Sequence, residues 1–94
     1  MKVRKKALIQ NACYLKDCQN SKEGWVKEAL ASKTIFQNGS KWYVQTLEGV
    51  MTGKQEDVLM QGIDKELYIC KKSIFDKTYD ILDKDLERNV KVIF

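Results

Sequence analysis

One segment of the chain has the hydrophobic spacing of an amphipathic helix. Apolar residues recur three and four positions apart, as they do when one helix face packs against a core. These residues are Trp25, Val26, Ala29 and Leu30. Asn20 and Glu23 stand just before them in the pattern of a capping box. The pattern predicts one main amphipathic helix over Ser21–Ser32.

The clearest signal for a turn follows this helix. Asn38 and Gly39 separate two β-compatible runs, Thr34–Phe36 and Trp42–Val44. An Asn-Gly pair favours a two-residue type I′ turn because both residues tolerate positive φ. We therefore expect a hairpin at this point, with a second reversal of the chain at residues 47–49.

The remaining β-compatible runs are short and are separated by polar or glycine-containing turns. They are Ala7–Leu15, Val50–Thr52, Val58–Met60, Leu67–Cys70 and Tyr79–Leu82. Ser73 is expected to cap a short helical turn between the last two. Together these segments predict an α+β domain, with a small, mostly antiparallel sheet of about five to six short strands and one main helix. We expect residues 1–82 to form this single domain and residues 83–94 to form a C-terminal tail or edge strand.

Residue composition excludes most kinds of catalytic site. The sequence contains no histidine, which excludes Ser-His-Asp and Cys-His catalysis and zinc sites that need imidazole. The five glycines stand singly, so there is no glycine-rich phosphate loop. Cys13, Cys18 and Cys70 are expected to be thiols, with a Cys13–Cys18 pair left open. We expect no enzymatic activity, no metal site and no cofactor. An enzyme built on Cys70 or on carboxylates alone is the remaining alternative, although Cys70 has no histidine to act as its base.

Charge and hydropathy place the chain among water-soluble proteins. There are 17 basic and 13 acidic residues, a net charge of +4, which is ordinary for a small domain. No apolar run approaches the ~20 residues that a membrane-spanning helix needs. We therefore expect a cytoplasmic protein with no membrane contact.

Three motifs stand in a characteristic order. The chain begins Met-Lys-Val-Arg-Lys-Lys, contains Thr-Leu-Glu-Gly at residues 46–49, and carries the segment Glu-Leu-Tyr-Ile-Cys-Lys-Lys-Ser-Ile-Phe-Asp-Lys-Thr-Tyr at residues 66–79. In this order and spacing they resemble a widespread family of short, mostly uncharacterised phage and prophage proteins of Gram-positive bacteria, over residues 1 to about 80. The family has prolines where this chain has Ala7, Gln55, Ile69 and Lys72, and its Gly-Asp-Tyr becomes Glu-Asp-Val at residues 56–58. The resemblance implies a phage or prophage origin and a place in the host cell cytoplasm, and it brings no catalytic residue.

Two functional hypotheses follow. The first is a non-enzymatic module that binds a host or phage protein, one use of which is to inhibit a host factor or defence system. The alternative is a nucleic-acid-binding accessory protein, in which the basic N-terminus contacts phosphates. Candidate contact residues for the two hypotheses are Lys2, Arg4, Lys5, Lys6, Trp42, Tyr43, Lys71, Lys72 and Phe94. A homodimer stays open, because a second copy can cover an exposed strand edge.

Overall fold

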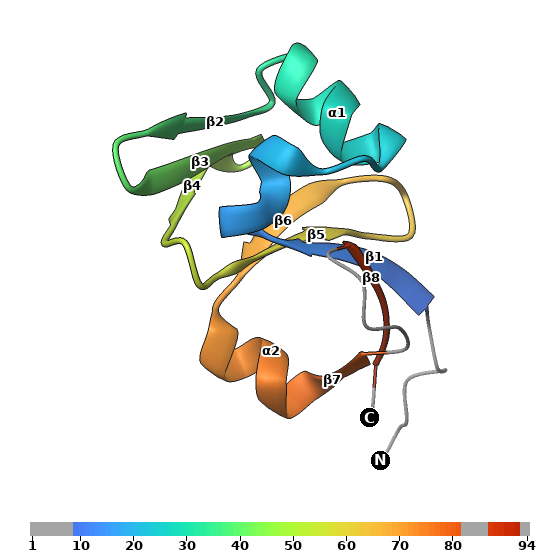
Figure 1. Ribbon diagram of the computed structural model, residues 1–94. Coiled ribbons are helices and arrows are strands. Elements are labelled where there is room, and N and C mark those ends of the chain that lie inside the picture. Colours follow the sequence, from blue (N-terminus) through green and yellow to red (C-terminus); the bar gives the residue numbers. More distant parts are fainter. Residues whose placement is uncertain (1–8, 82–86, 93–94) are drawn as a thin grey trace.

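The computed structural model describes residues 9–81 and 87–92 (Figure 1). Its strands are β1 (Ile9–Tyr14), β2 (Ile35–Asn38), β3 (Lys41–Thr46), β4 (Gly49–Gly53), β5 (Val58–Gln61), β6 (Leu67–Cys70), β7 (Tyr79–Ile81) and β8 (Glu87–Val92). Its helices are the 3₁₀ helix η1 (Leu15–Asn20), α1 (Gly24–Ala31) and α2 (Lys72–Thr78). The predicted α+β class is confirmed.

The strands form two antiparallel sheets, so the prediction of one sheet is wrong. Strands β6, β5 and β1 lie side by side, and β8 and β7 extend this first sheet in the order β6-β5-β1-β8-β7. The second sheet consists of β2, β3 and β4, joined by successive hairpins. The chain leaves the first sheet after β1, completes this three-stranded unit, and returns as β5 to pair with β1. The order of β-compatible runs along the sequence does not show that β5 pairs with β1.

The segment expected as a tail or edge strand contains β8. This strand pairs with β1 on one side and with β7 on the other, whereas an edge strand has one unpaired side. The rest of that segment, residues 83–86 and 93–94, lies outside the described residues.

The first sheet is buried on both faces, which produces two core clusters. On β5, Leu59 belongs to the larger cluster, which α1 and the second sheet also build. Its neighbours Val58 and Met60 point to the other face and pack in a smaller cluster with Phe75 of α2. Figure 1 shows the resulting layers, with α1 above the sheets and α2 below them.

The first hairpin differs in detail from its prediction. Asn38 pairs with Lys41, so the two turn residues are Gly39 and Ser40 rather than Asn38 and Gly39. Gly39 has φ 65°, and Ser40 is not among the residues with positive φ. This φ pattern fits a type II′ turn, which needs glycine at its first central position only.

Helix α1 begins three residues later than expected. Asn20 ends η1, and Ser21 follows in an extended conformation. The hydroxyl of Ser21 accepts a hydrogen bond from the Glu23 backbone N–H at 3.1 Å, so the expected capping box does not form. The predicted amphipathic face is nevertheless confirmed, because Val26 and Ala29 are buried and their apolar neighbours pack beside them.

A glycine holds the two sheets close together where β4 meets β6. A Cβ atom added to Gly53 would lie 2.9 Å from Leu15 Cδ1 and 3.0 Å from Ile69 Cγ2. Such separations are shorter than real Cβ contacts, so only glycine permits this approach.

Candidate functional site

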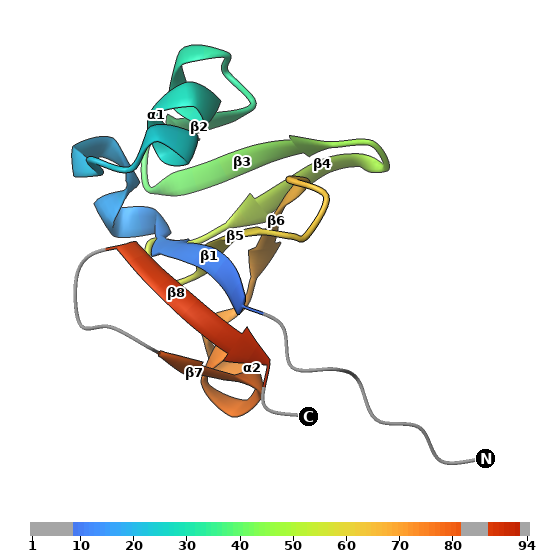
Figure 2. The same cartoon turned by 90° about the vertical axis from the view of Figure 1, so that its right-hand side faces the viewer.

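An open cleft lies between α1, the β3–β4 hairpin and the β5–β6 hairpin. Its volume is about 690 Å³, within the usual range for ligand sites. Gly53 and Ile69 bring β4 and β6 together, and other residues of the β3–β4 hairpin and of β6 line the cleft. Figure 2 shows that this turn and the β5–β6 loop lie at the same end of the molecule.

Large apolar side chains line much of the cleft. They come from α1, the β3–β4 hairpin and β6, and are Trp25, Leu47, Met51, Leu67 and Tyr68. Leu47 stands in a two-residue turn, where polar residues are usual, and its side chain is fully exposed. Two further exposed apolar residues lie on the same two hairpins: Val50 on β4 is 60% exposed, and Ile63 between β5 and β6 is 72% exposed. Clustered exposed apolar side chains are typical of binding surfaces in soluble proteins.

Three carboxylates also line the cleft, each from a different element. Glu28 lies on α1, Glu48 in the β3–β4 turn and Glu66 just before β6. Glu66 accepts a hydrogen bond from the Asp64 backbone N–H at 2.9 Å. Within residues 9–81 and 87–92, the side chains of Glu28 and Glu48 make no hydrogen bond or ion pair, so both carboxylates are available to a ligand. Lys65 is the one basic residue in the lining.

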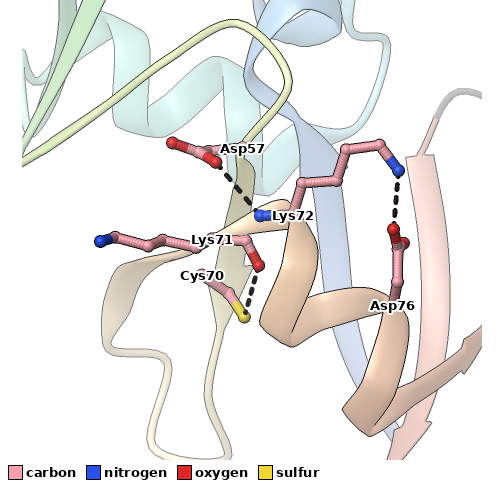
Figure 3. Close-up of polar contacts among 5 residues, drawn as sticks. All are labelled: Asp57, Cys70, Lys71, Lys72 and Asp76. Atoms are coloured by element: carbon pink, nitrogen blue, oxygen red, sulfur yellow. Dashed lines mark hydrogen bonds and ion pairs between the residues drawn. The ribbon is translucent and has the colours of Figure 1, made fainter.

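A second, smaller hollow surrounds the start of α2 (Figure 3). Asp57 accepts hydrogen bonds from the backbone N–H groups of Lys54 at 2.9 Å and Lys72 at 3.1 Å. It thereby ties the β4–β5 connection to the first turn of α2. Asp57 therefore has a structural role. Ser73 lies within α2 and makes no capping hydrogen bond, so the expected Ser73 cap is wrong.

Lys71 and Lys72 are exposed, as their candidate role requires, but their surroundings are electrically balanced. The Nζ atom of Lys72 lies 2.7 Å from the Asp76 carboxylate, and this hydrogen bond raises the pKa of Lys72. The three basic residues lining the hollow are matched by three acidic ones: Lys54, Lys71 and Lys72 against Glu56, Asp57 and Asp76. The hollow is therefore not a positive patch of the kind that binds phosphates.

Trp42, predicted as an exposed contact residue, is buried in the larger core. It is 1% exposed, and its indole N–H donates a hydrogen bond to Gln55 Oε1 at 3.1 Å. Tyr43, the next candidate, is half-buried and stacks on Phe36 with ring centroids 5.1 Å apart. Because successive strand residues point to opposite faces, these two aromatics cannot form one contact surface. Lys2, Arg4, Lys5, Lys6 and Phe94 lie outside the described residues.

The aromatic residues around α2 form a packed corner of the fold. Phe75 is 1% exposed. Its ring centroid lies 5.4 Å from that of Tyr79 and 6.1 Å from that of Tyr14. Burial and a hydrogen bond with Tyr68 raise the pKa of Tyr79. These contacts indicate a packed structural unit, and they leave little of its aromatic surface for a ligand.

The cysteines have the environment of structural thiols. Cys13 and Cys18 are buried, and each donates a weak hydrogen bond to the Tyr14 carbonyl at 3.5 Å. Cys70 is half-buried, and burial together with the nearby Asp57 carboxylate raises the pKa of its thiol. A nucleophilic cysteine needs the opposite shift. Among the described residues, no cluster of three or more cysteine or acidic side chains could hold a metal ion.

Leu47, Glu28 and Glu48 line the cleft but are not among the contact residues predicted from the sequence. Leu47 carried the one usable signal, since a large apolar residue is unusual in a tight polar turn. In the sequence, Glu28 has the pattern of a solvent-exposed position on an amphipathic helix. Only folding brings it to the same cleft as the β3–β4 turn.

Comparisons of the chain with protein-family models, with curated proteins and with solved structures found no match. The similarity to phage and prophage proteins therefore rests on the motifs alone. None of the helices in the described part of the chain has the length and apolar character needed to cross a membrane.

Proposed function

We propose that this chain is a non-enzymatic protein-binding module that takes a segment of a host or phage protein into the cleft beside α1. The observation that carries the proposal is the fully exposed Leu47 at the mouth of an open cleft with a largely apolar lining. The phage or prophage origin rests on the motif resemblance. Inhibition of a host factor or defence system is one use of such a module.

Electrostatics favours a protein partner over a nucleic acid. Carboxylates in the cleft repel phosphates, and the hollow at Lys71 and Lys72 carries as many acidic as basic residues. Trp42 is buried in the core and offers no face to a base, and one face of the Tyr43 ring is covered by Phe36. The alternative of nucleic-acid binding depends on the basic residues at positions 2–6, which lie outside the described residues.

Two features support a non-enzymatic role. The sequence has no histidine, and the thiol that is least buried, Cys70, has a raised pKa. Neither feature suits the general-base or nucleophilic chemistry that a hydrolase or transferase needs.

We expect the variant Leu47→Asp to lose the protein partner. The aspartate removes the apolar contact and has to be desolvated when a partner covers the cleft, so retention should fall by at least about tenfold, equal to ~1.4 kcal/mol. The measurement is an affinity pull-down of tagged chain from host lysate, with and without nuclease, read for proteins and nucleic acid. Ile74→Asp serves as the matched control, because Ile74 is 54% exposed on α2, far from the cleft.

Retention of the same protein by wild type and Ile74→Asp, but not by Leu47→Asp, supports the proposal. Loss of every retained protein on nuclease treatment contradicts it and favours the nucleic-acid alternative. Equal retention by Leu47→Asp and wild type also contradicts it.

A further inference from the structure

We propose that the segment bound in the cleft is cationic and apolar, a stretch of chain that carries lysine or arginine residues beside an aliphatic or aromatic anchor. This inference rests on the proposed function and specifies the partner's chemistry. The cleft combines two properties on one surface, an apolar lining and an excess of carboxylates, and a ligand has to match both.

The charge of the cleft is opposite to that of the chain. Three carboxylates and one ammonium group line it, which gives a formal charge of −2, whereas the whole chain carries +4. The carboxylates of Glu28, Glu48 and Glu66 come from three elements, so they surround the cleft instead of following one edge. Potentials of complementary sign steer a partner and fix its register. A cationic segment meets that condition.

The position of the carboxylates favours contact with a ligand over an internal structural role. Glu28 and Glu48 have no ion-pair partner within the described part of the chain, although the chain has 17 basic residues. Lys72 and Asp76 show that close ion pairs do form elsewhere on this surface. Within the described part of the chain, both carboxylates are therefore open to a lysine or arginine of the partner.

The apolar lining requires an anchor side chain as well. Leu47 and Met51 stand on the hairpin side of the cleft, and Trp25 and Leu67 come from α1 and β6. Methionine adapts to irregular apolar shapes, and an exposed leucine or tryptophan gains by removing its surface from water. A purely hydrophilic basic tail would leave this lining exposed. The geometry therefore points to a segment with both kinds of side chain.

The test is a selection of displayed random peptides on the immobilised full-length chain. Peptides of about twelve residues can span the cleft in extended form. Pools are selected on wild type and depleted on Leu47→Asn, which removes the apolar side chain without adding a charge, so that cleft-dependent binders remain. We expect these binders to be enriched in lysine or arginine together with a leucine, phenylalanine or similar residue. Their affinity, measured with synthetic copies, should fall as salt rises.

The charge requirement is measured with the double variant Glu28→Gln, Glu48→Gln. It should bind the selected peptides about five- to tenfold more weakly and with a smaller salt dependence, because its cleft has lost two carboxylates. Glu56→Gln is the matched control, since Glu56 is exposed and lies at the other hollow. Both glutamine variants keep the size of the side chain, and thermal unfolding verifies that each remains folded.

The outcomes separate this inference from the proposed function. Neutral or acidic peptides that depend on Leu47 but not on Glu28 and Glu48 overturn the inference and leave the proposed function standing. Absence of any Leu47-dependent peptide also overturns it, while the lysate pull-down judges the proposed function independently. Basic, apolar peptides weakened by the double variant and unaffected by Glu56→Gln support it.

Discussion

Replacing Trp42 by alanine is expected to lower the free energy of unfolding by about 3–5 kcal/mol. Trp42 is the largest fully buried side chain among the described residues and belongs to the cluster that joins α1 to both sheets. Its loss leaves a cavity between layers that meet at the close Gly53–Ile69 approach, so the surrounding residues have little freedom to collapse. For a chain of this length a total stability of about 5–14 kcal/mol is typical, and the variant would lose a large share of it.

The measurement is urea unfolding followed by far-ultraviolet circular dichroism, which does not depend on the removed indole. Trp42→Phe is the control: it keeps most of the apolar volume and loses the hydrogen bond to Gln55, so a smaller loss of about 1–2 kcal/mol is expected. If Trp42→Ala unfolds at the same urea concentration as wild type, the position of Trp42 in the core is wrong. Trp42 would then return as a candidate contact residue.

Replacing Phe75 by alanine is expected to cost about 3–5 kcal/mol through the smaller core. Phe75 is the one residue of α2 buried in that cluster, where it packs with Ala12, Val58 and Met60. Its ring also contacts Tyr14 and Tyr79, and aromatic pairs contribute beyond the area they bury. Because α2 has seven residues, too few to be stable alone, it depends on this anchor.

Ile74 provides the matched control on the same helix. It precedes Phe75 but is 54% exposed, so Ile74→Ala should change the free energy of unfolding by no more than about 0.5 kcal/mol. Hydrogen exchange of the α2 amides measures the local stability of this helix, and Phe75→Ala should increase the exchange rate there first. Equal effects of the two substitutions would contradict the described packing of α2.

The sequence predicted those elements whose signal is local. The spacing of Val26 and Ala29 identified the buried face of α1, and the glycine at position 39 identified a hairpin. The start of the helix and the position of the turn were predicted wrongly, because each depends on a single residue. Ser21 hydrogen-bonds the Glu23 N–H and delays the start of α1, and one positive φ at Gly39 suffices for the turn.

The division into two sheets could not be predicted from the same pattern. Strand β5 is apolar at three successive positions, 58–60, because both faces of the first sheet are covered. Such a run has no alternation that marks an inner and an outer face. Strand β1 is covered on both faces too, because Ala12 faces the smaller cluster and Cys13 the larger one. Pairing of β1 with β5 joins residues about fifty positions apart.

The candidate site was less predictable than the fold. Trp42 was expected at the surface because its strand gave no indication of which face is buried, and the structure places it in the core. The cleft combines residues from positions 25 to 68, and no local pattern links Glu28 with Glu48. Glu28, Glu48 and Leu47 can be recognised as parts of one site only after folding has brought α1, the β3–β4 hairpin and the β5–β6 hairpin together.

The central claim, that a protein partner binds at the cleft, is tested most directly by site-specific photo-crosslinking in host cells. A photoreactive phenylalanine analogue is placed at position 47 in one variant and at position 74 in another, since both side chains are exposed and lie on different layers. We predict a crosslinked adduct with a specific protein from position 47 and none from position 74. An adduct formed from position 74 but not from position 47 would contradict the assignment of the cleft as the binding site.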